Sequence, residues 1–326
     1  MIVPEINTLS EPIREELKQL EDVLKQSLKS DVELINIIND YILSNKGKRI
    51  RPMLLLLCAK LCGEVNETAL ISASLVEILH TATLVHDDIV DQAETRRGLP
   101  SINAIWKNKV SVLLGDYLFS RSLMNMVSIR DYKSLDLLSK TSELLSAGEI
   151  LQIEKSYTDG MTEEIYYDMI TAKTASLFAA SCELGARSVN SDEEKCKTLY
   201  QFGKALGMAF QIKDDLLDYV GSQLLMGKPL SRDIKENLVT LPLIFCLNGT
   251  DKHQRDEINR IMERGPNTEE IDQINSFVKD NGGVTYAQEK LNELTENAIE
   301  HLDMFPDSEV KRSLIGFTIF NGKRSK

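Results

Sequence analysis

Apolar residues recur along this chain at the spacing of helices. Near the N-terminus they lie three or four residues apart, at Ile13, Leu17, Leu20, Leu24 and Leu28. This spacing places them on one face of a helix, and Ser10 is positioned to cap its start. No run alternates apolar and polar residues between Asn-Gly or Asp-Gly turns, as a β-hairpin does. The pattern predicts an all-α protein.

Long helices are expected because proline is absent from the middle of the chain. None of the eight prolines lies between Ser101 and Lys228, so helices there meet no proline break. We expect helices over residues 11–30, 32–44, 50–62, 67–92, 101–107, 110–128, 131–157, 162–187, 191–220, 238–248, 251–264, 269–280, 284–303 and 307–320. No stretch rich in proline, glycine or serine divides the chain, so we expect residues 1–326 to form a single domain.

Composition narrows the class of protein. The 326 residues carry 38 basic and 50 acidic side chains, a net charge of −12, which disfavours a protein that binds nucleic acid. The longest stretch without a charged residue, Asn237 to Thr250, is too short and too polar to cross a membrane. The N-terminus lacks a signal sequence, and the odd number of cysteines argues against a disulfide framework. We expect a cytoplasmic protein without a transmembrane segment.

Two of the expected helices end on the same acidic pattern. One reads Asp87-Asp88-Ile89-Val90-Asp91 and the other reads Asp214-Asp215-Leu216-Leu217-Asp218. In each motif the first and last aspartates are four residues apart, so they lie about 6 Å from each other on one helical face. The middle aspartate is turned away by about 100°. Each motif therefore brings two like charges together, which destabilises a helix unless a cation binds them.

The ligand type identifies the cation. Carboxylates without matched cysteine or histidine ligands favour a hard ion such as Mg²⁺, Mn²⁺ or Ca²⁺. Mg²⁺ fits best because it takes one or two carboxylates and completes its octahedron with water and substrate phosphates. A pair of solvated acidic helix ends is the simpler explanation for one motif, but two copies in similar apolar surroundings make it weak.

Basic residues stand where a phosphate group would be held. Lys48, Arg49 and Arg51 cluster at the start of an apolar helix, where backbone N–H groups also attract anions. Arg96 and Arg97 follow the first acidic motif. In an acidic protein, basic clusters beside acidic helices favour a diphosphate site over a nucleic-acid patch.

Taken together, these motifs resemble the trans-type isoprenyl diphosphate synthases in order and spacing. The matching elements are Gly47-Lys48-Arg49-Ile50-Arg51-Pro52, His80, Asp87-Asp88-Ile89-Val90-Asp91, Arg96-Arg97-Gly98, Gly115-Asp116, Lys173-Thr174, Phe210-Gln211 and Asp214-Asp215-Leu216-Leu217-Asp218. The resemblance implies an all-α isoprenoid-synthase bundle around a central cavity, a homodimer, and condensation of isopentenyl diphosphate with an allylic diphosphate.

The resemblance also implies a role for each matching residue. Two to three Mg²⁺ ions would be held, with diphosphate bound, by Asp87, Asp91 and Asp214, with Asp88, Asp215 and Asp218 alongside. Isopentenyl diphosphate would be held by Lys48, Arg51, His80 and Arg97. The allylic substrate would be held by Arg96, Lys173, Thr174, Gln211 and Lys228. The family commonly carries a Gly-Lys pair where this chain has Asn237-Leu238, and we assign that segment and the basic C-terminus no role.

Product length depends on the helix that precedes the first acidic motif. Family members that stop early place an aromatic residue four or five positions before the first aspartate, where this chain has Thr83 and Ala82. These small side chains predict an open tunnel and a product of about six to ten isoprene units, with an octaprenyl-like length as the best estimate. Leu123 or Met124 on a neighbouring helix is the expected tunnel floor.

Other functions fit the sequence less well. The main competitor is a synthase of farnesyl or geranylgeranyl diphosphate, which the sequence does not separate cleanly from a long-chain enzyme. A class I terpene cyclase would not need the basic residues of the second substrate, and it usually lacks a second full aspartate motif. A non-catalytic synthase subunit typically has eroded acidic motifs, whereas both are intact here. A calcium-binding structural protein would show the alternating ligands of an EF-hand, which are missing.

Overall fold

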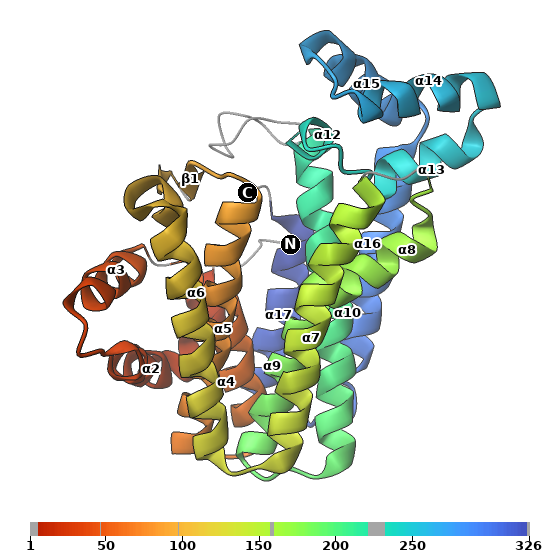
Figure 1. Ribbon diagram of the computed structural model, residues 1–326. Coiled ribbons are helices and arrows are strands. Elements are labelled where there is room, and N and C mark those ends of the chain that lie inside the picture. The colour runs from red at the N-terminus through yellow and green to blue at the C-terminus, as the bar shows by residue number, and fades with distance from the viewer. Residues whose placement is uncertain (1–5, 46, 97, 157–159, 221–231, 325–326) are drawn as a thin grey trace.

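The computed structural model describes residues 6–45, 47–96, 98–156, 160–220 and 232–324, and these residues form an all-α protein as predicted (Figure 1). The helical elements are α1 (Ile6–Leu9), η1 (Glu11–Ile13), α2 (Arg14–Leu28), α3 (Glu33–Ser44), α4 (Ile50–Cys62), α5 (Glu67–Val90), α6 (Ile102–Ile129), α7 (Tyr132–Ser156), α8 (Glu163–Ile170), η2 (Thr171–Ala175), α9 (Ser176–Ser188), α10 (Glu193–Val220), α12 (Arg232–Lys235), α13 (Leu241–Gly249), α14 (Lys252–Glu263), α15 (Thr268–Asp280), α16 (Gly283–Glu300) and α17 (Glu309–Lys323).

Most expected helices are confirmed within a few residues. These include the break between the expected helices 101–107 and 110–128, which is the kink inside α6 where Lys107 has φ 69°. Three differences have local causes. The expected helix 162–187 is divided by η2, a π-helical turn. Ser10 does not cap α2, because the 3₁₀ turn η1 intervenes and the Ser10 side chain bonds the Asn7 carbonyl. The expectation of no strands is wrong for one short hairpin.

That hairpin follows the first acidic motif. Strands β1 (Thr95–Arg96) and β2 (Leu99–Pro100) pair antiparallel. Gly98 has φ 79°, a conformation that glycine adopts without strain. The sequence lacks alternation here because two residues per strand are too few to show a period.

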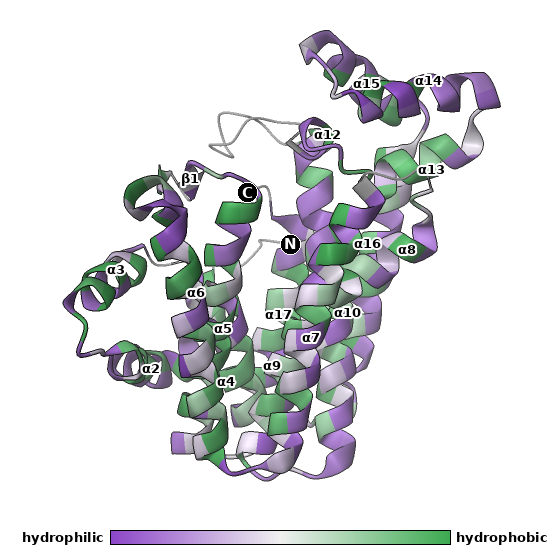
Figure 2. Cartoon of the chain, viewed as in Figure 1, coloured by the Kyte–Doolittle hydropathy of each residue, from purple (hydrophilic) through white to green (hydrophobic). Residues whose placement is uncertain are grey.

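The core is built on α9, which packs between α4 and α10. Close approach depends on glycine: a Cβ atom added at Gly185 would lie 2.3 Å from the Leu55 carbonyl oxygen, and one at Gly203 would lie 2.6 Å from the Phe178 carbonyl oxygen. Figure 2 shows that α4 and α5 inside the bundle are largely hydrophobic, whereas α14 and α15 are largely hydrophilic. A separate apolar cluster holds α13, α14 and α15 together beside the main bundle.

Helix α5 is more apolar than we expected from the sequence. It has the length and composition of a membrane-crossing helix, a criterion that we expected no segment to meet. However, 56% of its most apolar window is buried inside the protein. Because α5 packs against α2, α4, α6 and α9, we assign it as a core helix of the bundle.

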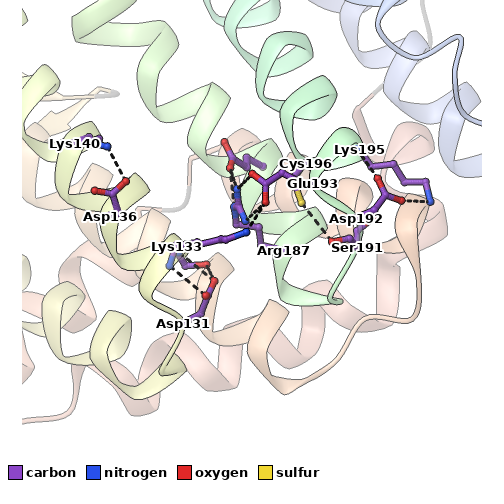
Figure 3. A network of polar contacts seen from close by, with 12 residues as sticks. Asp131, Lys133, Asp136, Lys140, Arg187, Ser191, Asp192, Glu193, Lys195 and Cys196 are labelled. Carbon is purple, nitrogen blue, oxygen red and sulfur yellow. Dashed lines mark hydrogen bonds and ion pairs between the residues drawn. The ribbon is translucent and has the colours of Figure 1, made fainter.

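An ion-pair network joins three helix ends at the end of the bundle opposite the acidic motifs (Figures 1 and 3). Arg187, at the end of α9, binds Glu183 at 2.6 Å and Glu193 of α10 at 2.8 Å. Lys133, at the start of α7, binds Glu193 at 2.8 Å. The network fixes these three helices to one another at that end of the bundle.

Candidate functional site

The first acidic motif lies at the end of α5, and its aspartate side chains point in two directions. Asp88, the middle aspartate, is buried and accepts a 2.7 Å hydrogen bond from Nε of Arg96. Asp87 and Asp91 lie on the other face, with the backbone N–H of Asp91 donating to the Asp87 carbonyl at 2.8 Å. The hairpin after α5 thus returns Arg96 to the motif, where it neutralises the middle carboxylate.

Asp87 faces further charged groups from α7 and η2. Burial, together with the carboxylates of Glu149 and Asp91, raises the pKa of Asp87 to about 7, and Lys173 and Arg96 oppose this shift. The Lys173 amine binds Glu149 at 2.7 Å and donates to Oε1 of Gln152 at 3.0 Å. An acidic group in these surroundings favours a nearby cation.

The second motif ends α10 and is also divided between two environments. Asp214 binds the Arg324 guanidinium at 2.5 Å, and that guanidinium stacks 4.2 Å from the centre of the Phe210 ring. Asp215 is buried, which raises its pKa to about 7. Asp218 accepts a 3.0 Å hydrogen bond from the backbone N–H of Asp233 in the short helix α12.

The π-helical turn η2 brings the two motifs together. Its Lys173 acts on Asp87 of the first motif, as described above. The next residue, Thr174, donates a 2.7 Å hydrogen bond to Oε1 of Gln211, one turn before Asp214. Because a π-turn holds an extra residue, it re-aims side chains within a helix, and such turns occur often at functional sites. Adjacent residues of one turn therefore act on both regions: Lys173 on Asp87 of the first motif, and Thr174 on Gln211, which in turn bonds Asp215 of the second motif.

The predicted isopentenyl diphosphate residues are brought together in part. Nη1 of Arg51, at the start of α4, lies 3.0 Å from Nε2 of His80 on α5. The Arg51 guanidinium also lies 4.7 Å from the centre of the Phe178 ring, and the Lys48 amine lies 6.0 Å from that of Phe320. The predicted residues Arg97 and Lys228 lie outside the described residues.

A pocket opens beside this group, on the side of α5 that carries Asp88. Its walls come from α2, α3, α5, α6 and the segments that follow α3 and α5. The pocket is lined by the predicted site residues His80 and Arg96 and by Gly47, which precedes the predicted Lys48. Apolar side chains such as Leu28 and Leu84 line the rest.

The chain-length residues occupy the expected helix. Ala82 is buried with 2% of its surface exposed, and the Thr83 hydroxyl donates to the His80 carbonyl at 2.8 Å. Met124, in contrast, is 61% exposed and Leu123 is 38% exposed, so the single subunit does not show them as the floor of a tunnel. Both side chains point outward from α6 because that helix lies at the surface of the bundle.

The residues present fit a divalent metal that is completed by substrate. Among the described residues, no three histidine, cysteine, aspartate or glutamate side chains converge tightly enough to hold an ion alone. The donors at the ends of α5 and α10 are all carboxylate oxygens, which suit Mg²⁺. Mg²⁺ typically takes few protein ligands and fills its remaining positions with water and phosphate.

Sequence reasoning missed three residues of this region. These are Glu149, which binds Lys173, Tyr166, whose hydroxyl donates to Asp215, and Arg324, which binds Asp214. None had a signal in the sequence, since each reaches its partner by folding rather than by local spacing. The basic C-terminus, to which no role was assigned, contributes Arg324.

Known proteins resemble this chain over nearly its whole length. The family model described as "Polyprenyl synthetase" matches residues 32–279. The "All-trans-nonaprenyl-diphosphate synthase (geranyl-diphosphate specific)" of Rhodobacter capsulatus is 35% identical over 314 residues, 94% of this chain and 94% of that protein. The octaprenyl diphosphate synthase of Escherichia coli (strain K12) is 33% identical over 311 residues, 95% of this chain and 96% of that protein. The crystal structure of polyprenyl synthase from Caulobacter crescentus CB15, complexed with calcium and isoprenyl diphosphate, superposes with a TM-score of 0.93 at 30% identity and covers 100% of both chains.

Proposed function

This chain belongs to the polyprenyl synthetase family, and we propose that it is a trans-type prenyltransferase that condenses isopentenyl diphosphate with an allylic diphosphate to form a long-chain all-trans polyprenyl diphosphate. The observation that carries the proposal is the position of η2, whose Lys173 acts on Asp87 of the first motif and whose Thr174 is linked through Gln211 to Asp215 of the second motif. Relatives that make octaprenyl and nonaprenyl diphosphates match nearly the full chain.

We assign the metal-binding role to Asp87, Asp91 and Asp214, with Asp218 alongside. Bound Mg²⁺ would neutralise the charge that develops on the allylic diphosphate as its C–O bond breaks. The carboxylates at the ends of α5 and α10 would hold the metal, and Lys173 adds a positive charge next to Asp87. The calcium and isoprenyl diphosphate in the Caulobacter structure support this pairing of cation and diphosphate.

The second substrate is assigned to the basic residues near the start of α4. Lys48, Arg51 and His80, together with Arg97, would bind the diphosphate of isopentenyl diphosphate. Arg51 is held by His80 and by the Phe178 ring, which positions its guanidinium at the helix N-terminus. Fixing this diphosphate places the double bond of isopentenyl diphosphate against the allylic cation. Arg96, Lys173 and Lys228 would bind the allylic diphosphate.

The enzyme is expected to act as a homodimer in the cytoplasm. Helix α6 exposes a row of large apolar side chains, which are Val112, Leu113, Phe119, Leu123, Met124 and Val127. Exposed apolar patches of this kind mark association surfaces. Burial of α5 in the core supports an enzyme without a membrane span.

Incubation with Mg²⁺, farnesyl diphosphate and radiolabelled isopentenyl diphosphate tests the proposal. We expect a ladder of products that ends at about six to ten isoprene units and is lost in Asp87→Ala. A single product of three or four units would assign a short-chain synthase. No incorporation with any allylic starter would favour a non-catalytic subunit, and a cyclic hydrocarbon would favour a terpene cyclase.

Replacement of Ala82 tests the basis of product length. Ala82→Phe places a large ring one turn below the metal site, where it should block the growing chain. We expect the product to shorten by several isoprene units, measured by chromatography of the dephosphorylated products. Ala82→Ser is the control because it adds little volume. Unchanged product length in Ala82→Phe would contradict the predicted tunnel.

A further inference from the structure

Asp215, the middle aspartate of the second motif, is enclosed by protein. Only 4% of its surface is exposed, whereas 42% of the Asp214 side chain is. The Tyr166 hydroxyl donates to Oδ2 of Asp215 at 2.6 Å, and Nε2 of Gln211 donates to Oδ1 at 2.9 Å. Both carboxylate oxygens therefore have protein donors, and little of the group is left for a metal.

These bonds continue to the reaction side of the site. Gln211 presents its NH₂ group to Asp215 and its oxygen to Thr174. The Thr174 hydroxyl donates to that oxygen at 2.7 Å. Asp215 thereby fixes which end of the Gln211 amide faces Thr174. Tyr166, fully buried on α8, in turn fixes Asp215.

The first motif shows the same division. Its middle aspartate, Asp88, is 3% exposed and is held by Arg96, while Asp87 is the residue that faces Lys173. In both motifs the middle carboxylate bonds other protein side chains. This agrees with its direction on the helix, about 100° away from that of its neighbours.

We propose that Tyr166 and Asp215 are positioning residues that orient Gln211 and Thr174 toward the allylic substrate, and that Asp215 is not a metal ligand. This inference rests on the proposed prenyltransferase function for its kinetic part. Its metal-binding part is independent of that function.

The metal part is tested by Mn²⁺ binding in the presence of inorganic diphosphate, followed by electron paramagnetic resonance. We expect Asp214→Asn to weaken Mn²⁺ binding at least tenfold and Asp215→Asn to change it less than twofold. Equal weakening by the two variants would make Asp215 a metal ligand and overturn the proposal. This comparison holds even if the protein has no prenyltransferase activity.

The positioning part is tested by kinetics. We expect kcat to fall about 100-fold in Asp215→Asn and about tenfold in Tyr166→Phe, while KM for both substrates changes less than threefold. Tyr286→Phe is the matched control, because Tyr286 donates to the Glu163 carboxylate at 2.7 Å outside the site. A Tyr166→Phe enzyme as active as Tyr286→Phe would overturn the role of Tyr166.

A double variant separates positioning from general damage to the fold. If Asp215 acts through Gln211, then Asp215→Asn combined with Gln211→Ala should be no slower than Gln211→Ala alone. Multiplied losses would show that Asp215 acts independently of Gln211. If Asp215→Asn does not fold by circular dichroism, Tyr166→Phe combined with Gln211→Ala gives the same comparison.

Discussion

Asp87 stands in surroundings that suit a bound metal and oppose folding without one. Its pKa, raised from 3.8 to about 7, means that the folded metal-free protein holds a proton there that the unfolded chain loses near pH 4. The stability linked to this group is therefore present below about pH 4 and is lost as pH rises through 7. We expect Asp87→Asn to raise the free energy of unfolding by about 1–3 kcal/mol at pH 8 and by less at pH 5.

Denaturant unfolding of the metal-free protein at the two pH values measures this difference. Asp303→Asn, at an exposed position, is the control and should show no such dependence on pH. The interpretation fails if Asp87→Asn is equally stabilising at pH 5 and pH 8, or if it destabilises the protein.

Arg324 binds Asp214, a carboxylate to which we assign a metal-binding role, so we expect Arg324 to compete with the metal. Its guanidinium lies 2.5 Å from Oδ1 of Asp214 and also donates to the Phe210 carbonyl at 3.1 Å. A metal ion that binds Asp214 must displace this contact. We expect Arg324→Gln to tighten the binding of Mn²⁺ alone by about three- to tenfold, roughly 0.7 to 1.4 kcal/mol.

Lys323→Gln is the matched control, because it removes the same charge from an exposed neighbouring residue. Isothermal titration of the two variants separates the direct contact from the general effect of charge. Equal affinities in both variants would argue against competition at Asp214.

At the scale of elements, η2 depends on how closely α7 approaches it. A Cβ atom at Gly148 would lie 2.7 Å from the backbone N of Lys173 and 2.9 Å from Cβ of Ala172. Gly148→Ala should push α7 away and loosen the contact between Lys173 and Glu149. We expect a loss of about 1–3 kcal/mol in unfolding free energy and a kcat reduced at least tenfold.

Gly249→Ala provides the comparison, since nothing lies within 4 Å of a Cβ atom there. We expect Gly148→Ala to unfold at a lower temperature than Gly249→Ala and to have a lower kcat, measured by thermal unfolding and steady-state kinetics. A Gly148→Ala enzyme with unchanged kcat would show that the position of α7 does not control η2.

The elements show which features local sequence determines. The existence and type of the long helices follow from apolar spacing, which is a local property. The π-turn does not, because Thr171–Ala175 is flanked by helix and gains its shape from packing against α7 and α10. The break inside α6, in contrast, lies where the sequence predicts it, at the non-helical residue Lys107.

At the scale of the whole molecule, the sequence indicates arrangements only among residues that lie close together along the chain. The spacing within each motif indicates the aspartate pairs, and the family resemblance groups Thr174 with Gln211, whose side chains lie 2.7 Å apart in the structure. It could not indicate that Arg324, 110 residues from Asp214, returns to that carboxylate. Nor could it show that Tyr166 holds Asp215, because this contact joins α8 to α10 only after both helices pack.

The surface of α6 leads to the last prediction, which concerns assembly. Leu113 is 62% exposed and Val127 is 64% exposed on the same helix, which is unfavourable for a monomer in water. We expect the protein to sediment at twice the chain mass of 36.7 kDa and Leu113→Glu with Val127→Glu to sediment as a monomer. Val32→Glu with Ile37→Glu, two exposed apolar positions outside α6, should leave the dimer intact. A dimer that persists in the α6 variant would place the interface elsewhere. Loss of the dimer only in the α6 variant would place the exposed face of α6 in the subunit interface, where a second chain covers apolar side chains that one subunit leaves exposed.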